Sequence, residues 1–172
     1  MDAVKAIKTR RSVRSYDPAP VPHAVLKRVL EAGRMAPSAC NIQPWCFIVV
    51  EEQSVREAIS HTGRYASFLA ESPAVIVGCG NKKISPKWHV VDVTIALENM
   101  VIAATAEGLG TCWIGSFNES KVNELLKIPD GYKVVALLAV GYPKQATSKT
   151  SAQNRKRLEE IVMHEEFGKP FK

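Results

Sequence analysis

Residues 88–107 constrain the fold of this chain more than any other stretch. They read WHVVDVTIALENMVIAATAE, and apolar residues cover nearly the whole helical surface. A helix that is apolar all round belongs inside a protein or a membrane. Asp92 and Glu98 favour burial in a soluble protein over a membrane span. The sequence therefore predicts a long helix in the middle of the molecule.

Strands and further helices are predicted on both sides of this segment. Apolar runs rich in β-branched residues predict strands at 46–52, 74–80 and 133–143, with 111–117 as a fourth candidate. Apolar spacing and capping residues predict helices from Asp2, over 22–33, over 55–61 and over 118–126. Prolines keep 16–21 extended. Because helices and strands intermix, the class is α/β or α+β.

Length and charge indicate one domain with an arm. The chain has 172 residues and a net charge of +6, with basic clusters in 5–14 and 144–157. After Pro143 the sequence turns polar and loses its apolar period, so we predict a body over 1–143 and an arm over 144–172. The four cysteines form no C-x-x-C pair, and no apolar leader follows the N-terminus. We expect a cytoplasmic protein.

The stretch TRRSVRSY crowds Arg10, Arg11 and Arg14 around Ser12. Guanidinium groups bind phosphate oxygens in a bidentate manner, and a serine hydroxyl adds a short donor. The cluster is either a phosphate cradle or the solvated basic end of a helix. A second basic cluster at 154–157 could close the same site.

Two loops carry polar or glycine-rich patterns. The loop 36–45 holds Ser38, Asn41 and Gln43, whose side chains can read the edge of a flat heterocycle. The alternative is a plain turn before a strand. The segment 108–117 has glycines that could let backbone N–H groups approach a ligand, or that simply end a helix. It lacks the G-x-G-x-x-G spacing, which disfavours a Rossmann site.

The remaining polar residues give weaker patterns. His89 and Asp92 lie three positions apart, and a structural role is favoured over a metal pair because no third ligand is evident. Cys40 lies in a loop with no histidine nearby to activate it.

Five blocks, in order, resemble the nitroreductase family of flavoproteins. They are AIKTRRSVRSY, RMAPSACNIQPWCFIVV, the block from Asp92 through Phe117, VVALLAVGYP and RKRLEEIV. The resemblance implies an α+β fold with a central, mainly antiparallel sheet flanked by helices. It also implies a homodimer with FMN at the interface and a C-terminal arm exchanged between subunits.

The resemblance also assigns site residues. It implies that Arg10 and Ser12 hold the FMN phosphate, and that Arg14 lies near the ribityl chain and pyrimidine edge. Arg11 belongs to the same cluster. The other implied contacts are the partner's loop, the segment beside the flavin ring with the Gly115 N–H near N5, and a phosphate contact from the arm. They involve Pro37, Ser38, Ala39, Asn41, Gln43, Trp113, Ile114, Gly115, Ser116, Arg155 and Lys156.

The implied activity is that of an FMN-dependent oxidoreductase. It would take hydride from NADH or NADPH and reduce nitroaromatics, quinones or similar electron-poor acceptors in a ping-pong cycle. No side-chain acid, base or metal is required. Reductive dehalogenation and flavin breakdown are alternatives on the same scaffold, and a non-catalytic nucleic-acid binder is a third. The short 60–90 region lacks the helical excursion that covers the pocket in larger relatives.

Overall fold

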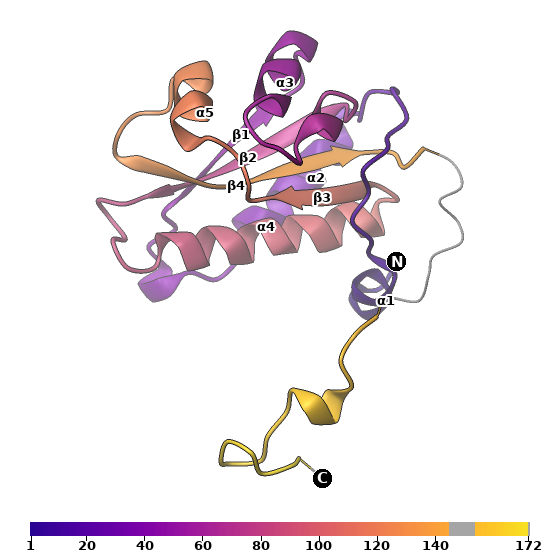
Figure 1. Ribbon diagram of the computed structural model, residues 1–172, viewed down its shortest axis with the longest axis vertical. Helices are drawn as coiled ribbons and strands as arrows, with labels where there is room; N and C mark the ends of the chain where they lie inside the picture. Colours follow the sequence, from indigo (N-terminus) through magenta and orange to yellow (C-terminus); the bar gives the residue numbers. More distant parts are fainter. Residues whose placement is uncertain (145–153, 172) are drawn as a thin grey trace.

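A four-stranded antiparallel sheet forms the centre of the protein (Figure 1). The computed structural model describes residues 1–144 and 154–171. The strands are β1 (Trp45–Val50), β2 (Ala74–Asn81), β3 (Gly110–Ile114) and β4 (Tyr132–Gly141), in the order β1-β2-β4-β3. All three pairings are antiparallel, and Ile48 lies opposite Val77 between β1 and β2. The expected α+β class is confirmed, and the predicted fourth strand is present.

Residues 1–144 and 154–171 include five α-helices. They are α1 (Ala3–Thr9), α2 (His23–Arg34), α3 (Gln53–Ser60), α4 (His89–Ala106) and α5 (Glu119–Leu126). Short 3-10 turns cover Ala39–Asn41, Ser67–Leu69 and Leu158–Glu160. The predicted caps are confirmed. Asp2 accepts a hydrogen bond from the backbone N–H of Lys5 at 2.9 Å, and Asn118 accepts one from that of Lys121 at 3.0 Å.

Each face of the sheet has its own apolar core, because strand side chains alternate between faces. On one face, α2 and α4 pack against the sheet, with Val29, Leu97 and Met100 fully buried. On the other face, α3 and α5 cover it with Ile59 and Val122. Figure 1 shows α4 below the sheet and α3 and α5 above it.

The prediction that the helix α4 lies in the middle of the molecule is only half right. By length and composition this helix could cross a membrane, but one side of it is packed against the sheet. The opposite side leaves Val91 and Ile95 exposed, by 44% and 37%, with Trp88 just before the helix exposed by 45%. The helix is apolar all round, yet one chain covers only one of its faces.

Candidate functional site

The arginine-rich segment lies along the start of β3. The backbone N–H of Val13 donates to the Thr111 carbonyl at 2.9 Å, and Ser12 forms a parallel bridge with Thr111. Gly110 permits this approach, because a Cβ there would lie only 2.6 Å from Cγ2 of Val13. The fold therefore joins two of the predicted site segments, which are about a hundred residues apart in sequence.

The three arginines of this cluster differ in their surroundings. Burial raises the pKa of the Cys112 thiol on β3, and the charges of Arg14 and Arg10 oppose that rise. Arg11 instead turns back, and its Nη1 donates to the carbonyls of Lys8 and Arg10 at 3.1 and 2.8 Å. These carbonyls lie at the end of α1, so Arg11 serves partly as a helix cap.

The segment after β3 leaves open space beside the chain. Trp113 and Ile114 end the strand, and Gly115 and Ser116 are exposed. A Cβ built on Gly115 would meet no atom within 4 Å. The backbone at Gly115 is therefore open on the side where a side chain would project.

Gly63 packs directly against the backbone of the same segment. A Cβ on Gly63 would overlap the Ser116 carbonyl oxygen and would lie 3.2 Å from Cα of Phe117. The Asn118 N–H also donates to the Thr62 carbonyl at 2.7 Å. The sequence analysis did not identify this turn as part of the site. A sequence feature that marks this turn is Gly63 itself, which lies between the predicted helix 55–61 and the predicted strand 74–80.

The loop that begins at Pro37 has an unusual backbone. Cys40, Asn41 and Gln43 have φ values of 50°, 55° and 52°, although none is glycine. Such conformations cost of order 1–3 kcal/mol each and need support from their surroundings. The hydroxyl of Ser38 accepts a hydrogen bond from the Gln43 N–H at 2.9 Å. This loop is thus a defined structure and differs from an ordinary turn.

Buried polar residues lie beneath that loop. Asp92 is 2% exposed, and its Oδ1 accepts a hydrogen bond from the Ala39 N–H at 3.1 Å. Nδ1 of His89 lies 2.8 Å from the Ser85 carbonyl. Both residues therefore contact backbone groups, in line with the structural role favoured above. No group of three or more possible metal-ligating side chains occurs within residues 1–144 and 154–171.

The fold keeps two groups of predicted site residues apart. The loop 37–43 is fixed to Asp92 near the start of α4, whereas Ser12 lies beside Thr111, beyond the end of that helix. Asp92 and Ala106 are separated by about 21 Å along the axis, at 1.5 Å per residue. Arg155 and Lys156 are exposed on the C-terminal segment.

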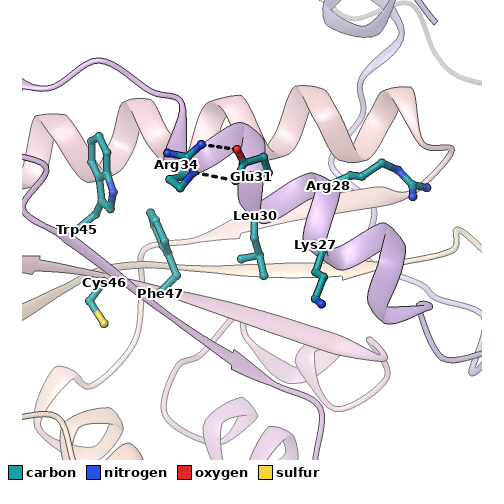
Figure 2. Close-up of a pocket in the computed structure, with 8 residues that line it drawn as sticks. All are labelled: Lys27, Arg28, Leu30, Glu31, Arg34, Trp45, Cys46 and Phe47. Atoms are coloured by element: carbon teal, nitrogen blue, oxygen red, sulfur yellow. Dashed lines mark hydrogen bonds and ion pairs between the residues drawn. The ribbon is translucent and has the colours of Figure 1, made fainter.

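A separate groove opens between α2 and the edge strand β1 (Figure 2). Its volume is about 770 Å³. Leu30, Trp45 and Phe47 line it with apolar side chains. Of its basic side chains, Arg34 pairs with Glu31 and Arg28 pairs with Glu107. It is lined by Lys27, Arg28, Leu30, Glu31, Arg34, Trp45, Cys46 and Phe47.

Comparisons with known proteins agree with this architecture. The Nitroreductase family model matches residues 7–62 and 55–142. A nitroreductase family protein from Clostridium novyi NT is 34% identical, with a TM-score of 0.80 over 99% of this chain and 97% of that one. An FMN-dependent nitroreductase from Clostridium difficile R20291 is 27% identical, with a TM-score of 0.87 over 95% and 99%.

A curated relative carries a related name. The FMN reductase [NAD(P)H] of Bacillus subtilis is 27% identical over 187 residues, which cover 96% of this chain and 74% of that protein. The family model extends over well more than half of the chain. The protein belongs to the nitroreductase family.

Proposed function

We propose that this protein is a homodimeric FMN oxidoreductase that oxidises NADH or NADPH and reduces flat, electron-poor acceptors. The bridge between Ser12 and Thr111 carries the proposal, because it joins the arginine-rich segment to the strand that leads into the open backbone at Gly115. A flavin mononucleotide has a phosphate at one end and a planar ring at the other. The names of the FMN-dependent and NAD(P)H-dependent relatives support this assignment.

The phosphate end of the ligand fits the cluster beside β3. Arg10, Ser12 and Arg14 supply guanidinium and hydroxyl donors, and Arg11 contributes through its remaining donors. We expect Arg155 and Lys156 of the arm to add contacts to the same phosphate. Hydrogen bonds to charged groups contribute roughly 1.5–3 kcal/mol each, so these residues retain the ligand more than they stabilise the fold.

The ring end fits the 113–116 segment. FMN held there would supply the redox chemistry between the nicotinamide and the acceptor. Trp113, Ile114 and Ser116 would lie beside the ring, and the Gly115 N–H would be the donor near N5. The open space next to Gly115 would accept donor and acceptor in turn, which favours a ping-pong cycle. Nitroaromatics and quinones are acceptors of the required flat shape.

A second copy of the chain would complete this site. The loop 37–43 is fixed far from the arginine cluster of its own chain, so Pro37, Ser38, Ala39, Asn41 and Gln43 would contact the FMN of the partner. Exposed apolar side chains favour such pairing, since large exposed apolar patches mark interaction surfaces. They are Val4, Ile7, Met35, Ile42, Trp88, Val91 and Ile95.

The arm would dock on the partner in the groove beside β1. Residues 158–171 expose several large apolar side chains and carry four glutamates against one lysine. The groove offers the apolar side chains of Leu30, Trp45 and Phe47 and the charge of Lys27 (Figure 2), and the outer edge of β1 can accept another strand. In this arrangement residues 1–143 form the body and 144–172 the exchanged arm. We place the dimer in the cytoplasm.

Absorbance of the purified protein tests the redox proposal. We expect a flavin band near 450 nm that NADH or NADPH bleaches without oxygen and that a nitroaromatic or quinone restores. Arg14→Ala should weaken FMN binding by about 10- to 100-fold. Lys121→Ala removes an exposed charge from α5 and serves as the control. Protein that neither carries nor takes up FMN would refute the proposal.

Light scattering tests the dimer. Ile95→Glu places a charge on the exposed face of α4 and should give a folded monomer with weakened FMN binding. Ser120→Glu adds the same charge on α5 and should leave the dimer intact. A wild-type monomer that binds FMN with full affinity would contradict the shared site.

A further inference from the structure

The loop 38–43 is closed by hydrogen bonds among its own residues, including one from the Gln43 N–H to the Ser38 hydroxyl at 2.9 Å. Cys40, Asn41 and Gln43 are exposed and adopt positive φ values, so their side chains do not bury the loop in a core. Within the loop, the Asn41 and Ile42 N–H groups donate to the Ser38 and Ala39 carbonyls at 3.0 and 3.1 Å. These local bonds close the turn, but they do not fix it to the body.

Asp92 provides a contact to the body. Its Oδ1 accepts the Ala39 N–H across 53 residues of sequence. Its Oδ2 is buried and has no hydrogen-bond partner among residues 1–144 and 154–171. Burying a carboxylate is unfavourable unless hydrogen bonds or ion pairs compensate for its lost hydration. Since Oδ2 has no such partner among the described residues, burial of the Asp92 carboxylate costs folding free energy.

An interaction with the helix dipole does not explain why the Asp92 carboxylate is buried. An acidic residue in a first turn interacts favourably with the helix dipole. That interaction does not require burial, and an exposed side chain would provide it as well. Asp92 instead faces inward at 2% exposure and directs one oxygen at a backbone group of the loop.

We propose that Asp92 is a positioning residue that holds the loop 38–43 ready for the cofactor. This inference rests on the proposed FMN function. The carboxylate touches neither cofactor nor substrate in this scheme. It acts through the Ala39 N–H, and it fixes the strained loop before the cofactor binds, so that binding does not have to order the loop.

Three substitutions of Asp92 separate the effect of its hydrogen-bond acceptor from the effect of its negative charge. Asp92→Asn keeps an acceptor oxygen and removes the charge, while Asp92→Ala removes both. Asp92→Leu keeps the branched shape with a larger side chain and no acceptor, and it provides a second test if the alanine variant fails to fold. Thr94→Ala is the control, because Thr94 is exposed on the same helix and bonds only within it, to the Val90 carbonyl.

Hydrogen exchange of the Ala39 amide gives a measurement that needs no cofactor. In FMN-free protein we expect exchange to rise at least about 10-fold in the alanine and leucine variants and to stay near wild type in Asp92→Asn. FMN titration should show about 10-fold weaker binding in the same two variants. Asp92→Asn should remain within about 3-fold of wild type, which is the rescue that a general loss of stability would not give.

The outcomes distinguish this inference from the function on which it rests. Wild-type affinity for FMN in folded Asp92→Ala or Asp92→Leu would overturn the positioning role alone. Equal losses in Asp92→Asn and Asp92→Ala would overturn it as well, since the acceptor oxygen would then be irrelevant. Wild-type protein that binds no FMN would overturn both the proposed function and the inference.

Discussion

Gly63→Ala tests whether the turn 61–66 sets the position of the 115–117 segment. The new Cβ would overlap the Ser116 carbonyl oxygen and would lie 3.0 Å from its carbonyl carbon. Non-bonded carbon–oxygen contacts lie near 3.3 Å, so relief requires a shift of about 1 Å. Both neighbouring atoms belong to the backbone and cannot rotate away. The backbone at Gly63 is itself outside the left-handed region, so the conflict comes from packing alone.

The expected effects follow from that displacement. Overpacking of this kind costs about 1–3 kcal/mol of unfolding free energy. For a chain of this size that lowers Tm by about 2–12 °C. A shift of about 1 Å at a reacting group can lower the rate by about 100-fold. We therefore expect Gly63→Ala to lower NAD(P)H-dependent turnover strongly even at temperatures where the variant is folded.

Thermal unfolding and steady-state assays on the same preparations provide the test. Gly115→Ala is the matched control for stability, because its Cβ would meet no atom within 4 Å. It should leave the Tm of FMN-free protein unchanged to within about 1 °C. If Gly63→Ala has both the Tm and the turnover of wild type, then this turn does not position the segment.

Three further predictions concern stability and thiol reactivity. Burial raises the pKa of Cys79 to about 12, so the fold favours the protonated thiol and loses up to about 4 kcal/mol of stability between pH 9 and 12. Cys79→Val should reduce that loss in denaturant titrations, and an unchanged loss would contradict it. Asn118→Ala removes the cap of α5 and should cost about 1 kcal/mol, whereas an unchanged denaturation midpoint would show that the cap is dispensable. A thiol reagent should leave the buried Cys79 and Cys112 unlabelled in native protein, and rapid labelling of all four thiols would contradict their buried positions.

Local patterns in the sequence determined most of the secondary structure. The β-branched runs predicted the strands to within a few residues, because alternation and composition act over short distances. Asp2 and Asn118 marked helix starts through bonds that span three residues. The glycine after Glu107 predicted the end of α4, where Gly108 has a φ of 80°.

The tertiary structure decided which of these elements meet. The bond between Asp92 and Ala39 and the packing of Gly63 on Ser116 join residues 53 positions apart. No local pattern encodes such contacts, because they depend on how helices and strands pack together. The same holds for α4, whose sequence shows an apolar helix, while only the packed chain shows which face is covered and which is open.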